Sequence, residues 1–84
     1  PQAIPLVRRA AEQRRALFGR DSPGVAQSLN QLGTVLALSA EYDEAERRLR
    51  EALDIRRRVL GEGELEVAQT ERALADGLTR RGEF

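Results

Sequence analysis

Apolar residues recur along this chain at the three- and four-residue spacing that is typical of amphipathic helices. After Tyr42, alanine and leucine side chains fall on one stripe, and arginine and glutamate occupy most positions between them. The stretch from Val25 to Leu36 repeats the same period, and no segment alternates apolar and polar residues long enough to predict a strand. The pattern predicts four helices, over roughly residues 2–18, 23–39, 43–60 and 64–81.

Residues that favour helix ends stand at the predicted boundaries. Ser22 precedes a proline, which is typical of an N-cap followed by proline in the first turn. Asp43, with Glu46 three residues later, predicts a capping box for the third helix. Gly19, Gly61 and Gly82 each follow a helical segment, where a left-handed C-cap favours glycine.

The second half of the chain repeats the first half with a period of 42 residues. When the chain is offset against itself by 42 positions, twelve residue pairs are identical, and residues 25–27 meet the same three residues at 67–69. Such self-similarity is the signature of a repeat architecture. We therefore divide the chain into two units, residues 1–42 and 43–84.

The apolar stripes predict one core that the helices share. We expect Ala45 and Ala52 to lie against Gly33, because small side chains let two helices approach closely. Glu71 is the exception: its counterpart in the first unit is Leu29, and we expect Glu71 to be at least partly exposed, since an unpaired buried carboxylate is costly. The predicted core residues are Ala3, Val7, Ala10, Leu29, Leu32, Gly33, Leu36, Tyr42, Ala45, Leu49, Ala52, Leu53, Leu60, Val67, Leu74 and Leu78.

Residues 29–53 resemble a tetratricopeptide repeat. Residues 29–36 have the pattern Leu-x-x-Leu-Gly-x-x-Leu, which is similar to the first helix of that repeat, called A. Residues 41–45, Glu-Tyr-Asp-Glu-Ala, resemble the turn into the second helix, B, and residues 49–53 resemble the part of B that packs against A. The turn departs from the family's pattern in having Ala40 where glycine is usual.

The resemblance implies an all-α fold, a right-handed superhelical solenoid of antiparallel helix pairs with its four helices in the order B-A-B-A. Residues 1–84 would form a single fragment of such a solenoid, with one complete A-B pair over about residues 23–60 and a half repeat on either side. The 42-residue period and the link over residues 19–26 resemble kinesin-light-chain-type repeats. Ser22 replaces the histidine of that link, and the second unit lacks its proline.

In this family the concave groove lined by the A helices binds a peptide or protein segment, and the resemblance implies the same here. An asparagine pair that can bond an extended peptide is broken, because one unit has Asn30 and Gln31 and the other has Arg72. Arg72 and Arg80 are able to pair with an acidic ligand, unless Asp76 neutralises them. The implied groove residues are Gln27, Asn30, Gln31, Thr34 and Leu38 on the first A helix and Gln69, Arg72, Asp76 and Arg80 on the second.

Two other interpretations stay open. The polar groove positions are equally compatible with solvated helix faces that bind nothing, because exposed helix faces are polar by default. The chain is also compatible with a structural spacer or an oligomerisation segment of a larger protein. A groove with apolar pits would favour ligand binding, whereas an evenly charged groove would favour a spacer.

Composition removes several classes of function. The chain has no Cys, His, Lys, Met or Trp, so it lacks the residues of a thiol nucleophile, a Ser-His-Asp triad, an ordinary transition-metal site and a P-loop. We therefore expect no enzyme activity, no cofactor and no metal. Fourteen basic residues balance fourteen acidic ones, and we expect the arginine clusters to form surface ion pairs rather than a nucleic-acid site. The expected acidic partners are Glu12, Glu44, Glu51 and Asp54.

No run of residues approaches the ~20 apolar positions of a membrane span, so we expect no membrane partner and a cytoplasmic protein. A solenoid without polar capping repeats exposes apolar faces at its ends. We expect these faces to favour head-to-tail self-association, with an isologous dimer as the competing arrangement. In the head-to-tail arrangement, Val7, Ala10 and Phe18 of one copy would lie near Leu74 or Leu78 of another.

Overall fold

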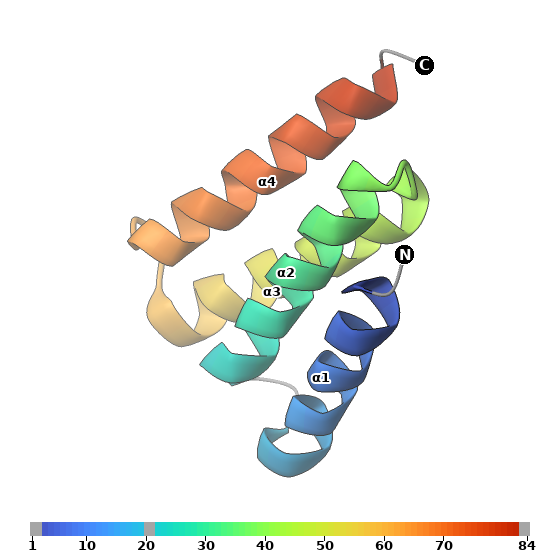
Figure 1. The fold of residues 1–84 in the computed structure, drawn as a ribbon. Helices are drawn as coiled ribbons and strands as arrows, with labels where there is room; N and C mark the ends of the chain where they lie inside the picture. The colour runs from blue at the N-terminus through green and yellow to red at the C-terminus, as the bar shows by residue number, and fades with distance from the viewer. Residues whose placement is uncertain (1–2, 20–21, 83–84) are drawn as a thin grey trace.

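The computed structural model describes residues 3–19 and 22–82. These residues form four α-helices and no strand, which confirms the predicted all-α class. The helices are α1 (Ala3–Phe18), α2 (Pro23–Leu38), α3 (Tyr42–Leu60) and α4 (Leu65–Gly82). Figure 1 shows consecutive helices running in opposite directions, with α2 lying between α1 and α4. α2 packs against all three other helices, so it is the centre of the fold.

The predicted N-cap of α2 and two of the three predicted C-caps are confirmed. The third is wrong, because Gly82 is the last residue of α4 and does not have a positive φ. The Ser22 hydroxyl oxygen accepts a hydrogen bond from the Val25 backbone N–H at 3.1 Å, which satisfies one of the unpaired donors of the first helical turn. Gly19 and Gly61, which follow α1 and α3, have φ angles of 80° and 95°. Glycine adopts such angles without the steric cost that a Cβ atom adds.

The start of α3 differs from the prediction. The helix begins at Tyr42, and the residue before it makes no side-chain capping bond, so the predicted capping box of Asp43 and Glu46 is wrong. Both carboxylates bind Arg81 of α4 instead. The Arg81 guanidinium lies 2.6 Å from Asp43 Oδ1 and 3.1 Å from Glu46 Oε1. A tertiary ion pair has therefore replaced the local bond that the spacing suggested.

The turn between α2 and α3 places an alanine in a left-handed conformation. Ala40 has φ 63°, and it is the position at which the resembling family usually has glycine. The Glu41 N–H donates to the Leu36 carbonyl at 2.8 Å, and the Ala40 N–H donates to the Ala37 carbonyl at 3.2 Å. These two bonds make a Schellman motif, which needs one left-handed residue.

Most of the predicted core is buried, and α2 supplies much of it. Nine predicted residues are buried: Leu29, Leu32, Gly33, Leu36, Ala45, Leu49, Ala52, Leu53 and Val67. Five more are half-buried: Val7, Ala10, Tyr42, Leu60 and Leu74. Leu78 is 42% exposed, so its assignment to the core is wrong. The side chains of Ala3 and Phe18 lie outside the described residues.

The sequence prediction missed a second set of buried residues. Three helices surround α2, so it buries more than the single stripe on which the prediction depended. In α1 the best-buried face is that of Ile4 and Ala11, which contacts α2, rather than that of Val7 and Ala10. The missed residues are Ile4, Ala11, Val25, Ala26, Ala37 and Ile55, and the polar residues Ser28, Arg56 and Thr70.

The predicted close approach of α2 and α3 at Gly33 is present. A Cβ atom added to Gly33 would lie 2.5 Å from Leu49 Cγ and 3.3 Å from the Ala45 carbonyl oxygen. Glu71 is exposed, as predicted, and its carboxylate accepts a hydrogen bond from Arg57 of α3 at 3.0 Å. The position that is leucine in the first unit thus carries an ion pair in the second.

Ion pairs connect α1 to α3 across the surface of the molecule. Arg8 binds Glu44 at 2.7 Å and Arg15 binds Glu51 at 2.8 Å, and Arg48 lies between the two carboxylates at 3.5 and 3.1 Å. The predicted pairing of arginines with Glu44, Glu51 and Asp54 is confirmed. Glu12 makes no ion pair with a described residue, so that part of the prediction is wrong.

Candidate functional site

The surface between α2 and α4 is the candidate site, and we call it the α2–α4 groove. The two helices lie side by side in the same direction (Figure 1). Their close approach is at Gly77, where an added Cβ would make an ordinary contact with the Ala37 side chain at 3.9 Å. Two hollows lie along this surface, one near the C-terminal halves of the helices and one near their N-termini.

The first hollow, which we call the small-residue hollow, has an apolar floor and a polar rim. It has a volume of about 120 Å³ and is open to solvent. Ala37 is buried in its floor, and Leu38 on its rim is 66% exposed. The residues that line it are Thr34, Ala37, Leu38, Ala73, Asp76, Gly77 and Arg80. Small floor residues leave room for a side chain of a ligand, and the rim offers one anion, one cation and one hydroxyl.

The charged residues of this rim, Asp76 and Arg80, and the nearby Arg72 form no ion pair within residues 3–19 and 22–82. Asp76 and Arg80 stand four residues apart on α4, and Arg72 stands four residues before Asp76. Such spacing permits ion pairs on a helix, but none of the three makes one with a described residue. The structure therefore does not pair these charges with one another, and they remain available to a ligand.

The second hollow, which we call the polar hollow, has a volume of about 280 Å³ and lies between the first turns of α2 and α4 and the end of α3. Gln27 and Gln69 occupy the same position in the two repeat units and both line it, from α2 and α4 respectively. The full lining is Pro23, Gln27, Arg56, Leu60, Glu66 and Gln69. Side-chain amides on both sides can donate to and accept from a peptide backbone.

A buried polar cluster joins α2, α3 and α4. Arg56 donates to the Thr70 hydroxyl at 2.7 Å and to the Glu66 carbonyl at 3.1 Å. Thr70 Oγ1 lies 3.0 Å from Asn30 Oδ1 and 3.1 Å from the Glu66 carbonyl, so its single proton is donated to one of these two acceptors. Burial lowers the pKa of Arg56 from its ordinary value, and the negative charge of Glu66 opposes that shift.

The nine predicted groove residues separate into three groups. Thr34, Leu38, Asp76 and Arg80 line the small-residue hollow, and Gln27 and Gln69 line the polar hollow. Asn30 is half-buried, and its side-chain oxygen Oδ1 lies at hydrogen-bond distance from the Thr70 hydroxyl. This oxygen therefore contributes to the contact between α2 and α4. Gln31 and Arg72 are exposed and line neither hollow.

Sequence reasoning missed the two buried members of the cluster, Arg56 and Thr70. Arg56 lies in a run of three arginines, and such a run is typical of a solvent-exposed helix face. A usable signal was present at the 42-residue offset, where Thr70 of α4 meets Ser28 of α2. Two hydroxyl residues at equivalent helical positions indicate a recurring buried contact, although only Thr70 forms hydrogen bonds among the described residues.

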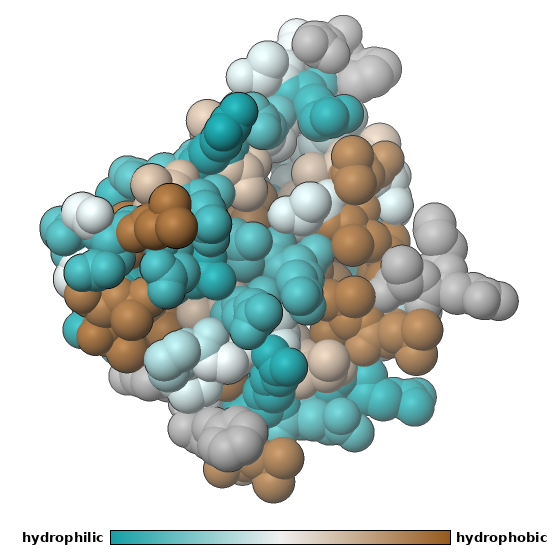
Figure 2. Space-filling model, turned by 60° about the vertical axis from the view of Figure 1, so that its left-hand side comes forward, coloured by the Kyte–Doolittle hydropathy of each residue, from teal (hydrophilic) through white to brown (hydrophobic). Residues whose placement is uncertain are grey.

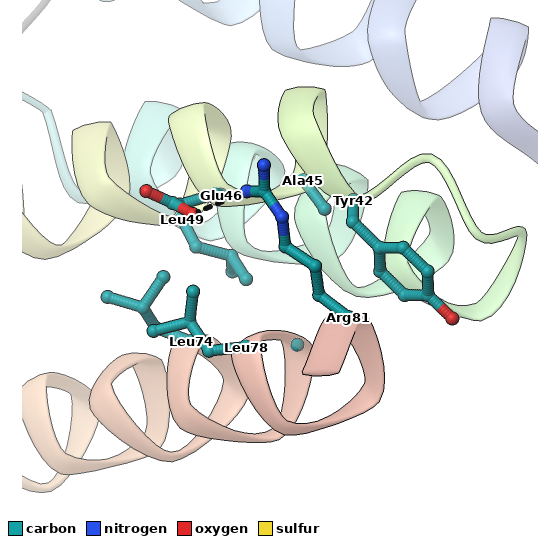
Figure 3. A pocket seen from close by; sticks show the side chains of 8 residues that line it. Tyr42, Ala45, Glu46, Leu49, Leu74, Leu78 and Arg81 are labelled. Atoms are coloured by element: carbon teal, nitrogen blue, oxygen red, sulfur yellow. Dashed lines mark hydrogen bonds and ion pairs between the residues drawn. The ribbon is translucent and has the colours of Figure 1, made fainter. Parts of the chain in front are cut away.

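A third hollow lies between α3 and α4, and Figure 3 shows it. Leu74 and Leu78 of α4 point toward Leu49 of α3, and Arg81 reaches across to Glu46, with 3.1 Å between Nη1 and Oε1. The space has a volume of about 10 Å³, roughly the minimum that holds a single water molecule. It is a packing gap between two helices rather than a site.

Metal and membrane sites find no support in the described part of the chain. Residues 3–19 and 22–82 contain no cluster of three or more acidic side chains that could hold a metal ion. None of their helices combines the length and the apolar character that crossing a bilayer requires. On the face drawn in Figure 2, apolar side chains form separate patches among polar ones rather than one continuous band.

Comparisons with known proteins agree with the motif over residues 29–53. A family model described as tetratricopeptide repeat matches residues 1–58. The match covers α1, α2 and nearly all of α3. Among curated proteins, none matches the chain in sequence.

Proposed function

The chain belongs to the tetratricopeptide repeat family, and from that membership we propose that it binds a peptide or protein segment in the α2–α4 groove. Repeats of this family stack into arrays whose concave surfaces bind other proteins. In this proposal α2 and α4 are A helices, α1 and α3 are B helices, and the pairs wind into a right-handed superhelix of the kinesin-light-chain type.

The observation that carries the proposal is the small-residue hollow. Its floor is made by Ala37, Ala73 and Gly77, and its rim holds charges that form no ion pair among the described residues. An evenly charged groove would have no such apolar pit. The fitting ligand is an extended segment with an apolar side chain seated on the floor and a charged group next to Arg80 or Asp76.

The polar hollow supports the same mode of binding. Gln27 and Gln69 are exposed and face the groove from two neighbouring helices. An extended backbone laid along the groove would present its N–H and C=O groups to these amides. Asn30 contributes less than the resemblance implies, because Thr70 lies at hydrogen-bond distance from its carbonyl oxygen.

The test is a selection of random peptides, displayed on phage, against the full 84-residue chain. Enriched peptides should bind the parent chain and lose about tenfold or more in affinity, roughly 1.4 kcal/mol, when Ala73→Leu fills the hollow or Arg80→Glu reverses its rim charge. The matched control is Ala16→Leu, which adds the same side chain to an exposed position on α1. Equal binding by all variants, or no enrichment at all, would favour the structural spacer instead.

A further inference from the structure

Arg56 is a buried cation that has no anionic partner among the described residues. It is 7% exposed, and its Nη1 donates only to neutral oxygens, the Thr70 hydroxyl at 2.7 Å and the Glu66 backbone carbonyl at 3.1 Å. Proteins rarely bury an arginine unless an acid pairs with it, because the guanidinium loses its hydration. An anion placed beside this guanidinium would therefore supply a partner that the described fold does not.

The unused edge of the guanidinium belongs to a residue that lines the polar hollow. A guanidinium has five N–H donors, and neither Nε nor Nη2 of Arg56 bonds a described residue. Neither nitrogen is fully enclosed by protein atoms, and Arg56 lines the hollow together with Leu60 and Gln69. Because Nε and Nη2 lie on the same edge of the planar group, they form a fork of parallel donors.

We propose that the polar hollow binds a carboxylate of the groove ligand, with Nε and Nη2 of Arg56 donating to its two oxygens. The inference rests on the proposed peptide binding, and it adds a group from α3, a helix to which the resemblance assigns no groove residue. A carboxylate matches the fork of a guanidinium with two parallel hydrogen bonds. Gln27 and Gln69 are exposed in the same lining, and each has an amide NH₂ that can donate to this carboxylate.

The fold prepares Arg56 for an anion in two ways. The side chain is already desolvated in the folded chain, so binding does not have to remove most of its water. Its two bonds through Nη1 fix the plane of the guanidinium, and one of them goes to Thr70, which lies 3.0 Å from Asn30 Oδ1. A rigid donor in a site of low dielectric constant binds an anion more tightly than a mobile surface arginine does.

The equivalent arginine of the first repeat unit provides a matched comparison. Arg14 also donates through Nη1 to a backbone carbonyl, that of Gly24 at 3.1 Å. Arg14 is half-buried rather than buried, and it does not line the polar hollow. It therefore shares the bond of Arg56 to the fold without the surroundings that the proposal requires.

Glu66 is the one acidic residue in the described lining of the hollow. It is half-buried and makes no ion pair with a described residue, and its charge opposes the fall in the pKa of Arg56. A bound carboxylate would be repelled by this charge. Glu66→Gln should therefore strengthen carboxylate binding by about threefold or more. Glu12→Gln, which removes the same charge at an exposed position on α1, should leave it unchanged.

The test uses two small carboxylates and NMR spectra of the isotope-labelled 84-residue chain. N-acetylglutamate α-amide presents a side-chain carboxylate, and N-acetylglycine presents the carboxylate of a chain end. At constant ionic strength, at least one of them should shift the Arg56 Nε–H resonance and the side-chain amide resonances of Gln27 and Gln69 in a saturable way. The probe that binds more tightly identifies the source of the carboxylate. The uncharged amides of both probes should cause no shift.

Further variants locate the binding. Gln69→Glu adds a competing carboxylate to the hollow at an exposed position, and it should weaken probe binding by about threefold or more. Its matched control is Gln13→Glu, at an exposed position on α1, which should bind as the parent does. Arg56→Gln should abolish the response, and Arg14→Gln should keep it. If Arg56→Gln does not fold, Gln69→Glu and Glu66→Gln decide the question.

The outcomes separate this inference from the proposed function. Phage-selected peptides that lose affinity in Ala73→Leu, together with an Arg56 that responds to neither carboxylate, would overturn the carboxylate site and leave peptide binding in place. A saturable response to a carboxylate without any enriched peptide would support the site and contradict peptide binding. Unchanged probe affinity in both Gln69→Glu and Glu66→Gln would also overturn the proposal, because the carboxylate would then bind outside the hollow.

Discussion

Arg14 and Arg56, which are 42 residues apart, donate the same hydrogen bond in two places of the fold. Each Nη1 lies 3.1 Å from the backbone carbonyl ten residues further along, that of Gly24 for Arg14 and that of Glu66 for Arg56. Both bonds tie one helix to the first turn of the next. The two junctions differ in one respect: Arg56 also donates to the buried Thr70 hydroxyl.

The two arginines should therefore differ in their contribution to stability. Arg56→Gln removes the donor to one buried and one partly buried acceptor, and we expect it to lower the free energy of unfolding by about 1–3 kcal/mol. Arg14→Gln removes one partly exposed bond and should cost about 0.5–1.5 kcal/mol. Urea unfolding followed by circular dichroism measures both. Arg50→Gln, at an exposed position, is the control. A larger loss for Arg14→Gln than for Arg56→Gln would contradict this assignment.

A second contrast lies in Thr70 and Ser28, which occupy equivalent positions in α4 and α2. Thr70 Oγ1 accepts from Arg56 and lies 3.0 Å from Asn30 Oδ1, whereas Ser28 Oγ is buried without a hydrogen-bond partner among the described residues. Thr70→Val should lower stability by about 1–3 kcal/mol, since it leaves the Arg56 guanidinium short of an acceptor. Ser28→Ala should be neutral or slightly stabilising. Urea unfolding of the two variants measures these changes. Similar losses in the free energy of unfolding for Thr70→Val and Ser28→Ala would show that the two hydroxyls contribute equally to stability.

The helices themselves could be predicted from local pattern, because periodicity and end signals act within one segment. The face that each helix buries could not always be predicted, since it depends on how many neighbours the helix has. α3 buries the predicted Ala45, Leu49 and Ala52. α1 instead buries Ile4 and Ala11, because among the described helices it packs on α2 from that side.

Part of the groove could be predicted from the sequence, because its residues occupy helix positions at which the resembling family binds its ligands. Thr34 and Leu38 of α2, and Asp76 and Arg80 of α4, line the small-residue hollow because positions four residues apart on a helix share one face. Asn30 is predicted as a ligand-binding residue because the sequence does not reveal that Thr70 Oγ1 of another helix lies 3.0 Å from its side-chain oxygen Oδ1. Such a bond between residues 40 positions apart depends on the tertiary fold.

Gly33 offers a test of the closest helix contact. Gly33→Ala places a Cβ atom 2.5 Å from Leu49 Cγ and 2.7 Å from its Cδ2, so the Leu49 side chain must move or α2 and α3 must separate. We expect a net loss of about 1–3 kcal/mol from overpacking. Gly77→Ala is the matched control, because its Cβ would meet Ala37 at an ordinary 3.9 Å; the higher helix propensity of alanine should stabilise it by up to about 1 kcal/mol. Leu49→Val added to Gly33→Ala should recover part of the loss, and no recovery would place the strain elsewhere.

Ala40 holds a conformation that costs an L-residue about 1–2 kcal/mol relative to the right-handed region. Its φ of 63° is required by the Schellman motif in which Glu41 donates to Leu36 at 2.8 Å. Ala40→Gly keeps those backbone bonds and removes the steric cost, although the unfolded chain gains conformational freedom. We expect a net gain of about 0.5–1 kcal/mol in the free energy of unfolding.

Two reciprocal variants separate this backbone effect from any change in packing. Gly61→Ala has no atom within 4 Å of the added Cβ, so any loss of stability arises from its φ of 95° alone. Ala16→Gly, at an exposed position inside α1, should lose about 1 kcal/mol from lower helix propensity. The expected order of midpoints in urea is Ala40→Gly above the parent, and Gly61→Ala and Ala16→Gly below it. If Ala40→Gly unfolds at a lower urea concentration than the parent, the strain that it relieves in the folded state is smaller than the conformational freedom that the unfolded chain gains, and the predicted net gain is wrong.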